Sequence, residues 1–469
     1  MTTLDRPHLY LGGEWVEPAS AETIAVENPA TEEVLGHVPA GTAADVDRAV
    51  AAARAAFEGW AGTSPAERGA VLDRLHTCLA ARAGDIARTV GLELGTPLKV
   101  AKAVQAGLPL TVLRGYADLA VRPQSAETIG NSLIVHEPVG VVGAITPWNY
   151  PLHQVVAKVG AALAAGCKVV LKPSELTPLV AYLLVDAAVE AGVPAGVLNL
   201  VTGTGPVVGA AIAGHPQVDM VSFTGSTATG RAISHAAADR IARVALELGG
   251  KSANVILEDA DVARAVKVGV GNAFLNSGQT CTAWTRMLVH RSRYDEAVEL
   301  AAKTAAGYPV GDPFDEATRL GPLVSAAQRE RVRGFLERAD ARLVAGGLAA
   351  PVPAVGYFVA PTVFADVDPA SELAQEEIFG PVLSIIGFGS DDEAVEIANN
   401  SRYGLAGGVW GSADRAMAVA RRMRTGAVDV NGGAFNPLAP FGGYKQSGIG
   451  RELGAYGLAE FQQVKAVQQ

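Results

Sequence analysis

A cysteine ends a loop of small and hydroxyl-bearing residues, Asn276-Ser277-Gly278-Gln279-Thr280-Cys281. The loop follows a helical pattern of apolar residues at 266–275 and precedes a strand-like segment at 287–289. Such a turn is expected to expose the thiol, as a nucleophile requires, because the thiolate is the attacking species. The alternative is a buried structural cysteine, since free cysteine is among the most buried residue types.

Two further side chains have types that suit catalysis. Glu247 lies between Leu246 and Leu248 at the end of an apolar segment, and apolar surroundings can raise the pKa of a carboxyl to the range of a general base. Asn149 follows another apolar segment, where its amide could donate to an oxyanion. An exposed acid at a strand end and an ordinary turn asparagine are the alternatives. The fold must bring these distant residues to Cys281.

Two segments could hold a phosphate-bearing cofactor. Residues 225–230 lie between a predicted strand and a predicted helix, where backbone N–H groups can bind a phosphate. This segment is neither a P-loop nor a G-x-G-x-x-G motif, and a tight structural turn is its alternative. Lys172 and Glu175 follow a buried strand and could bind ribose hydroxyls, or could be an ordinary strand-end and capping pair. An acid at this place repels a 2′-phosphate, which favours NAD over NADP.

The elements that position these residues alternate between strand and helix from residue 139 onward. Apolar strands are predicted at 139–146, 168–172, 197–201, 220–223 and 244–248, with helices such as 174–192 between them. This alternation predicts an α/β fold with a parallel, doubly wound sheet that binds ligands at the carboxyl ends of its strands. A second α/β set begins after Lys251, with a strand near Leu288 and helices from Tyr294, Ser325 and Asp392.

The first part of the chain is predicted to be a scaffold. It has an edge hairpin at 9–16 and helices that begin at the capping boxes of Thr42 and Ser64. Two more helices are predicted at 84–93 and 97–119, and we interpret this alanine-rich block as packing only. A β-branched segment at 132–137 interrupts the α/β pattern and indicates an arm outside the main body.

Composition excludes several classes of protein. The chain has 469 residues, which is too long for one compact core. Its net charge of -10 argues against nucleic acid or an anionic membrane as a partner. Three cysteines far apart (Cys78, Cys167 and Cys281) and an N-terminus without an apolar signal core favour a cytoplasmic protein. No histidine cluster has metal-ligand spacing, so no metal site is expected.

Seven segments together closely resemble the aldehyde dehydrogenase superfamily. They occur in the family's order over nearly the whole chain and are Thr146-Pro-Trp-Asn-Tyr-Pro151, Leu171-Lys-Pro-Ser-Glu175, Phe223-Thr-Gly-Ser-Thr227, Glu247-Leu-Gly-Gly-Lys-Ser252, Gly278-Gln-Thr-Cys281, Glu376-Glu-Ile-Phe-Gly-Pro381 and Pro440-Phe-Gly-Gly-Tyr-Lys445. The resemblance implies a Rossmann-like NAD-binding domain (1–120 and 139–248), an α/β catalytic domain (249–448) and a small β oligomerisation arm (121–138 and 449–469). It also implies a homodimer or homotetramer.

The resemblance implies a role for each candidate. Cys281 would attack the aldehyde, while Asn149 and the backbone N–H of Cys281 hold the oxyanion. Hydride transfer would leave a thioester, and Glu247 would activate the water that releases the acid. The implied cofactor-binding residues are Ile145, Thr146, Pro147, Trp148, Lys172, Ser174, Glu175, Gly205, Phe223, Gly225, Ser226, Leu248, Gly249, Glu377 and Phe379. Lys251 and Lys445 would support the site.

The substrate follows from the entrance to this site. Its predicted lining is Tyr150, Gln154, Leu275 and Phe441, with the loop 435–438 beside them. These residues are mostly apolar or neutral and include no arginine that could bind a carboxylate, which favours an aliphatic or aromatic aldehyde. The alternatives are a semialdehyde (an ω-oxo acid), a CoA-acylating aldehyde dehydrogenase, and a catalytically silent binding protein of the same fold.

Overall fold

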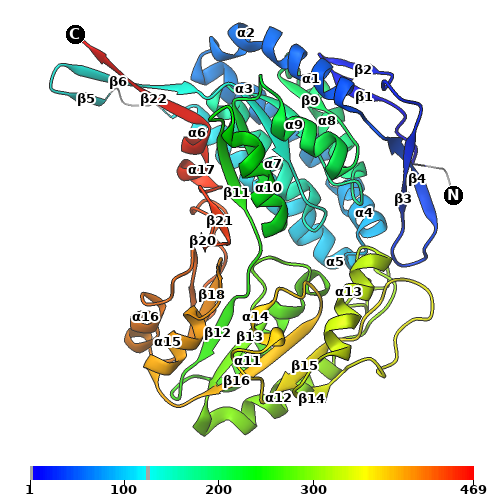
Figure 1. Ribbon diagram of the computed structural model, residues 1–469, viewed down its shortest axis with the longest axis vertical. Coiled ribbons are helices and arrows are strands. Elements are labelled where there is room, and N and C mark those ends of the chain that lie inside the picture. The colour runs from blue at the N-terminus through cyan, green and yellow to red at the C-terminus, as the bar shows by residue number, and fades with distance from the viewer. Residues whose placement is uncertain (1–3, 123–126) are drawn as a thin grey trace.

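The computed structural model describes residues 4–122 and 127–469 and consists of two α/β units with a thin β arm (Figure 1). One unit lies above the other in this view, and the arm extends from the upper unit to the C-terminus. Residues 1–3, part of the N-terminus searched for a signal segment, and residues 123–126 of the predicted arm lie outside the described residues.

The sheet of the upper unit has five parallel central strands. Its order is β2-β1-β9-β8-β7-β10-β11-β21, with bounds Glu14–Val16, Leu9–Leu11, Leu198–Leu200, Lys168–Lys172, Val141–Ile145, Met220–Thr224, Arg243–Glu247 and Gly448–Ile449. Strands β9 to β11 pair in parallel, whereas the edge pairings to β1 and β21 are antiparallel. The predicted doubly wound sheet is confirmed, and its strand order reverses between β7 and β10. Ligands bind at such a reversal.

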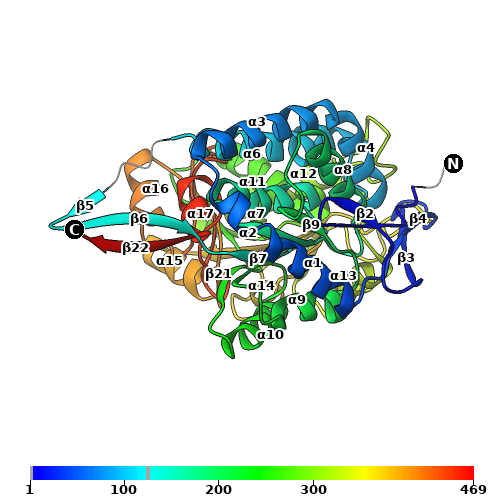
Figure 2. The ribbon, with the colours of Figure 1, turned by 90° about the horizontal axis from the view of Figure 1, so that it is seen from above.

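Helices cover both faces of this sheet (Figure 2). One face packs on α3 (Pro65–Ala81), α4 (Ala83–Glu93), α6 (Gly107–Ala120), α7 (Pro151–Ala165) and α8 (Leu179–Glu190). The other face packs on α1 (Ala43–Ala55), α9 (Ala210–Gly214) and α10 (Thr227–Ala238). Alternate residues enter the two cores: Val142 and Ala144 of β7 face the first, and Val141 and Ile145 face the second. Burial on both faces explains why these strands are continuously apolar.

The helix starts at Thr42 and Ser64 form as predicted, each with a complete capping box. Two helix boundaries differ from the prediction. The helix expected at 174–192 is α8 and begins only at Leu179, because residues 175–177 form a turn before Pro178. The helix expected at 97–119 is divided into α5 (Leu98–Val100), a π-helix (Ala101–Ala106) and α6.

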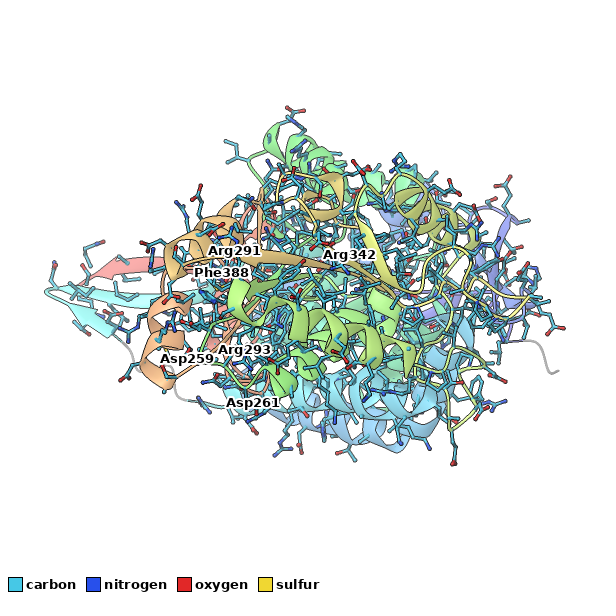
Figure 3. All side chains as sticks on the ribbon, turned by 90° about the horizontal axis from the view of Figure 1, so that it is seen from below. Asp259, Asp261, Arg291, Arg293, Arg342 and Phe388 are labelled. Atoms are coloured by element: carbon cyan, nitrogen blue, oxygen red, sulfur yellow. The ribbon has the colours of Figure 1, made fainter. Side chains whose placement is uncertain are left out.

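The lower unit has its own sheet, with helices on both faces. Its order is β14-β15-β16-β13-β12-β18-β19, with bounds Arg342–Ala345, Thr362–Ala365, Val382–Phe388, Arg286–His290, Ala253–Ile256, Gly407–Trp410 and Asp429–Val430. Helices α11 (Val262–Phe274) and α12 (Tyr294–Ala306) pack on one face, and α13 (Ala326–Glu337), α15 (Asp391–Asn399) and α16 (Ala413–Ala420) on the other. Arg291, which pairs with Glu393, and Arg342, which pairs with Asp366, belong to this unit and are labelled in Figure 3.

The arm is a three-stranded antiparallel sheet. Its order is β22 (Gln462–Gln468), β6 (Ser132–Pro138) and β5 (Glu127–Ile129), so the predicted strand at 132–137 forms and pairs with the C-terminal segment. Helix α17 (Gly454–Glu460) leads from the main body into β22. Smaller elements are β3 (Thr23–Glu27), β4 (Val34–Pro39), β17 (Tyr403–Gly404), β20 (Tyr444–Lys445), α2 (Phe57–Ala61) and α14 (Glu372–Gln375). None of the helices in the described ranges has the length and apolar character needed to cross a membrane.

Candidate active site

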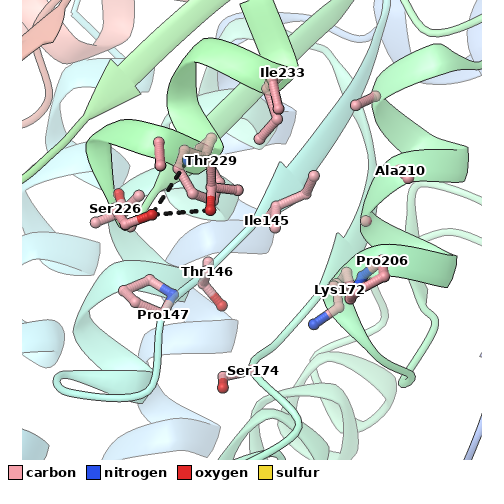
Figure 4. Close-up of a pocket in the computed structure, with 18 of the residues that line it drawn as sticks. Ile145, Thr146, Pro147, Lys172, Ser174, Pro206, Ala210, Ser226, Thr229 and Ile233 are labelled. Carbon is pink, nitrogen blue, oxygen red and sulfur yellow. Dashed lines mark hydrogen bonds between the residues drawn. The ribbon is translucent and has the colours of Figure 1, made fainter. Parts of the chain in front are cut away.

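A cleft of about 650 Å³ lies at the carboxyl ends of β7, β8 and β10, where the strand order reverses (Figure 4). Its lining includes most of the residues predicted to bind the cofactor: Ile145, Thr146, Pro147, Trp148, Lys172, Ser174, Glu175, Gly205, Phe223, Gly225 and Ser226. Pro206, Ala210, Ala228, Thr229 and Ile233 line it as well. Ala228 and Thr229 belong to the segment 225–230 predicted for phosphate, whereas Pro206, Ala210 and Ile233 were not predicted because apolar residue types carry no chemical signal.

Helix α10 begins at this cleft. The Ser226 hydroxyl caps it by accepting a hydrogen bond from the Thr229 N–H at 3.2 Å, and it lies 2.9 Å from the Thr229 hydroxyl (Figure 4). A Cβ on Gly225 would lie 2.4 Å from the Phe223 ring, so only glycine fits between this ring and the cleft. A helix N-terminus with free backbone N–H groups suits a phosphate.

A lysine and a glutamate meet at the opposite wall of the cleft. Lys172 donates to the Glu175 carboxylate at 3.0 Å, and the backbone N–H of Gly205 donates to the other carboxylate oxygen at 3.2 Å. Although burial acts to raise the pKa of Glu175, Lys172 and these hydrogen bonds bring it below its usual value. The carboxylate is therefore ionised and fixed where a ribose would lie.

A second cavity of about 290 Å³ adjoins the first and shares Pro147, Trp148, Thr224, Gly225 and Ser226 with it. It contains Cys281 and Asn149, together with the remaining residues predicted to bind the cofactor, Leu248, Gly249, Glu377 and Phe379. The rings of Trp148 and Phe379 meet edge to face, with centroids 5.2 Å apart. One continuous hollow thus leads from the ribose site to the thiol.

The cysteine loop has an unusual backbone. Asn276, Ser277 and Gly278 have φ values of 53°, 58° and 74°, in the left-handed region that costs energy for residues other than glycine. A Cβ on Gly278 would lie 2.0 Å from the Gly380 carbonyl oxygen, so the loop packs directly against the backbone that follows Phe379. Phe379 is itself left-handed, with φ 63°. Two strained segments therefore hold each other at the site.

The thiol is partly accessible, as a nucleophile requires. Cys281 is half-buried and lines the second cavity. Burial, followed by the nearby carboxyls of Glu377 and Glu247, raises the pKa of the Cys281 thiol to about 12. Hydrogen bonds from the backbone N–H groups of Thr282 and Cys281 favour the thiolate but do not offset these effects.

Asn149 is anchored through both its side chain and its backbone. Its amide nitrogen donates to the Gln279 carbonyl at 3.0 Å, which leaves one N–H of the NH₂ group for another acceptor. Its carbonyl accepts from the amides of Asn276 at 2.9 Å and Gln105 at 3.0 Å. The amide is thus tied to the cysteine loop and faces the same cavity as the thiol.

Glu247 ends β11 and is buried. Its Oε2 has no hydrogen-bond partner among the described residues. Burial raises the pKa of Glu247 well above its usual value, and the charge of Glu452 raises it further. Glu452 pairs with buried Lys158, which also donates to the Thr224 hydroxyl at 2.6 Å. A carboxyl of raised pKa with an unused oxygen suits a general base.

Charged and polar residues surround Glu377, and not all of them were predicted from the sequence. The Glu377 carboxylate accepts from the Gly250 N–H at 3.0 Å, and burial raises its pKa to about 7. Burial lowers the pKa of Lys251, whose Nζ has no partner among the described residues, to about 7. Gln328 and Arg331 of α13, which the sequence analysis missed, donate to the carbonyls of Phe379 at 2.8 Å and Glu377 at 2.7 Å. Both line the second cavity.

The four residues predicted to contact the substrate are not among those that line the two cavities, and their settings differ. The Tyr150 hydroxyl lies 2.7 Å from that of Thr280, beside Cys281 in the chain. Gln154 accepts from the Thr224 hydroxyl at 3.1 Å and is buried. The Phe441 ring packs edge to face on exposed Phe435, with centroids 6.3 Å apart. Leu275 begins the cysteine loop and accepts from the Thr280 hydroxyl at 3.2 Å.

Comparisons with known proteins agree with this geometry. Residues 15–467 match the sequence model of the Aldehyde dehydrogenase family. A 3-succinoylsemialdehyde-pyridine dehydrogenase from Pseudomonas is 49% identical over 99% of this chain and 98% of its own length. Geranial dehydrogenase from Castellaniella defragrans is 46% identical over 99% of both chains.

Solved structures are equally similar. A mutant of aldehyde dehydrogenase C from Pseudomonas syringae, in complex with NAD+ and octanal, has a TM-score of 0.97 and 49% identity, covering 98% of this chain and 96% of its own. A Mycobacterium tuberculosis aldehyde dehydrogenase with NAD+ has a TM-score of 0.97 and 43% identity, covering 100% of this chain and 99% of its own. This chain belongs to the aldehyde dehydrogenase family.

Proposed function

We propose that this NAD-dependent enzyme oxidises an apolar aldehyde to the carboxylic acid through a covalent adduct on Cys281. The observation that carries the proposal is the placement of Cys281, Asn149 and the Trp148–Phe379 pair in one cavity that continues into the ribose-binding cleft. A reacting carbonyl carbon in this cavity can meet a nucleophile, an oxyanion donor and a hydride acceptor together.

The cofactor fits the residues of the cleft. Ser226 and the N-terminus of α10 would hold the pyrophosphate, Lys172 and Glu175 the adenosine ribose, and Glu377 the nicotinamide ribose. When bound, NAD supplies the hydride acceptor. The fixed carboxylate of Glu175 repels a 2′-phosphate, which supports a preference for NAD over NADP.

In the first half of the reaction, the Cys281 thiol loses its proton to solvent and its sulfur attacks the aldehyde carbon. The remaining N–H of the Asn149 amide and the backbone N–H of Cys281 donate to the oxyanion that forms. This stabilisation is effective because the amide is already held by Gln279 and requires no rearrangement. Loss of hydride then leaves an acyl group on the sulfur as a thioester.

In the second half, Glu247 takes a proton from water, which attacks the thioester carbon. The acid leaves and the thiol is restored. The raised pKa of Glu247 gives it the basicity that this step requires. A glutamate in this place supports hydrolysis over transfer of the acyl group to CoA.

The aldehyde is proposed to be apolar. The loop predicted at the entrance carries the exposed apolar residues Phe435 and Leu438, and the Phe435 ring packs on Phe441. Two similar proteins support this choice: one is named for geranial and the other was solved with octanal. A semialdehyde is a second candidate, because a relative at 49% identity is named for 3-succinoylsemialdehyde-pyridine.

Three further properties are part of the proposal. The chain divides into an NAD-binding domain (1–120 and 139–248), a catalytic domain (249–448) and an arm (121–138 and 449–469). The arm joins copies of the chain into a homodimer or homotetramer, which is supported by its exposed apolar residues Ile129, Val464 and Val467. The three free cysteines support a cytoplasmic location.

The test is NADH formation with aliphatic aldehydes of increasing length, aromatic aldehydes and carboxylate-bearing semialdehydes, each with NAD and with NADP. We expect turnover with NAD and apolar aldehydes, and its complete loss in Cys281→Ala although NAD still binds. Preference for a semialdehyde would select the second candidate. Turnover that requires added CoA would refute the proposal in favour of an acylating enzyme. The absence of turnover with every aldehyde tested would refute it in favour of a silent protein.

A further inference from the structure

The carbonyl of Asn149 is held by two side-chain amides from different parts of the fold. Asn276 donates at 2.9 Å from the cysteine loop, and Gln105 donates at 3.0 Å from the helical block before β5. A carbonyl oxygen has two lone pairs, so these donors use its full capacity. Thr96, in the same helical block, donates to the other end of the Asn276 amide at 2.8 Å. Asn149 is therefore fixed from two sides.

Gln105 lies on an irregular stretch of helix. The π-helix Ala101–Ala106 separates α5 from α6, and the Gly107 N–H donates to the Lys102 carbonyl, five residues back. Pro109 has no N–H that could donate to the Gln105 carbonyl, so the regular pattern of helix hydrogen bonds is interrupted here. Within the π-helix Gln105 is buried and Lys102 is exposed. Single π turns occur frequently at functional sites.

Packing alone does not explain a glutamine at position 105, because burying its polar amide is destabilising. It is fully buried, and its Oε1 has no hydrogen-bond partner among the described residues. Its Nε2 must face Asn149, because a carbonyl oxygen can only accept. A leucine or methionine would fill a similar volume without burying an unsatisfied acceptor. The contact with Asn149 is what the amide provides.

We propose that Gln105 is a positioning residue for the oxyanion-binding amide of Asn149. The proposal rests on the oxyanion role given to Asn149 above. The carbonyl and the side-chain amide belong to one residue, so a bond that fixes the carbonyl also fixes the direction in which the side chain leaves the backbone. Asn276 belongs to the cysteine loop, as does the Gln279 carbonyl that accepts from the Asn149 amide, whereas Gln105 holds Asn149 from the helical block. Gln105 thus adds a constraint on Asn149 that does not come from that loop.

The test compares Gln105→Leu and Gln105→Glu with the wild type, with Asn149→Ala and with Lys102→Leu, a control on the exposed side of the same π-helix. Three quantities are measured: the rate of the pre-steady-state NADH burst, the affinity for NAD, and the rate at which iodoacetamide alkylates Cys281. For Gln105→Leu we expect a burst about 10-fold slower, since a small misplacement of a catalytic group is costly. NAD affinity and alkylation should not change, because neither uses the oxyanion site.

The Gln105→Glu variant adds a readout that packing cannot produce. A protonated carboxyl can donate to the Asn149 carbonyl, whereas an ionised one cannot and repels it. The burst rate of this variant relative to wild type should therefore rise as the pH falls, while the ratio for Gln105→Leu stays flat. A flat ratio for both variants, with the Gln105→Glu burst as slow as that of Gln105→Leu, would overturn the proposal.

The remaining outcomes separate the inference from the function beneath it. An unchanged burst in Gln105→Leu with a lost burst in Asn149→Ala would overturn the role of Gln105 alone. An unchanged burst in Asn149→Ala would refute the oxyanion role, and the inference with it. A parallel loss of burst, NAD affinity and alkylation in both Gln105 variants would show a general collapse of the site and would also overturn the proposal.

Discussion

Cys281 combines a reactive position with an unfavourable resting charge state. Burial and the carboxyls of Glu377 and Glu247 raise the pKa of its thiol to about 12, so the free enzyme holds it as a neutral thiol near pH 7. The oxidised nicotinamide carries a positive charge, and its proposed site beside Phe379 is in the same cavity. A positive charge in the same cavity favours the thiolate and lowers the thiol pKa.

We therefore expect NAD+ to accelerate alkylation of Cys281 by iodoacetamide at pH 7.5. The rate should rise about 10-fold for each unit by which the thiol pKa falls, because only the thiolate reacts. The measurement follows the modified Cys281 peptide by mass spectrometry over a range of pH. NADH, whose ring is neutral, should not accelerate the reaction. The same rate profile with NAD+ and NADH would contradict the electrostatic explanation, and Cys78 serves as an internal control.

Glu247 gives a second prediction at this scale. Glu247→Gln should keep a burst of NADH close to one per active site, since acylation does not use this carboxyl. Steady-state turnover should fall by a factor of about 10² to 10⁴, the usual contribution of a general base. Rapid-mixing absorbance at 340 nm, the ordinary signal of NADH, separates the two phases. A variant without a burst would place Glu247 in the acylation half instead.

The functional residues at strand ends and in the cysteine loop could be predicted, because the pattern of apolar residues shows where each strand ends. Every residue predicted to hold the cofactor lines one of the two adjoining cavities. Gln105, Gln328 and Arg331 could not be found, because their partners are backbone carbonyls of distant segments. Cys281 is half-buried and lines a cavity whose walls include Trp148 and Glu377 from distant parts of the chain, a setting that no local pattern shows.

Ile241 is an exposed, β-branched residue in a left-handed conformation. It follows α10, has φ 55° and keeps 93% of its surface exposed. Its N–H donates to the Ala238 carbonyl and the next N–H to that of Ala237, which is the helix ending that glycine normally provides. A left-handed residue with a Cβ destabilises the folded state by about 1–2 kcal/mol. Glycine removes this strain, but it also increases the conformational entropy of the unfolded chain, which offsets part of the gain in stability.

Ile241→Gly should therefore raise the free energy of unfolding by about 0.5–1 kcal/mol. Ile241→Asn should give a smaller gain, because asparagine tolerates this region, and Ile241→Ala should give little, because it keeps the Cβ. Denaturant titration followed by circular dichroism measures all three. If Ile241→Gly were less stable than the wild type, the side chain must have a contact that outweighs the backbone strain.

At the scale of elements, the sequence predicted where capped helices begin better than where a helix is interrupted. The capping boxes of Thr42 and Ser64 are local signals and formed as predicted. The π-helix at Ala101–Ala106 has no such signal, because it depends on packing as well as on Pro109. The late start of α8 reflects Glu93, whose buried carboxylate accepts from the N–H groups of Leu179 and Val180. This contact spans many residues and is invisible to a local pattern.

At the scale of the whole molecule, the two sheets meet where chemistry is needed. Only residues 248–252 connect β11 of the upper sheet with β12 of the lower, and Glu247 ends β11 at this connection. The C-terminal segment returns to the upper sheet through β21, which pairs with Glu247 in β11. Alternation of strands and helices was enough to predict two α/β units, whereas this return is a long-range pairing that periodicity cannot show.

The arm gives the last prediction. Strands β6 and β22 pair over their full length, yet Ile129, Val464 and Val467 remain 61%, 66% and 40% exposed. Exposed apolar residues on a thin sheet indicate contact with another copy of the chain. Wild-type protein should therefore sediment as a dimer or tetramer, and the double variant Val464→Asp, Val467→Asp should sediment as a smaller species. Val355→Asp, which places the same charge on an exposed apolar residue of a loop outside the arm, should leave the assembly intact. A wild-type protein with the mass of one chain at micromolar concentration would refute this role of the arm.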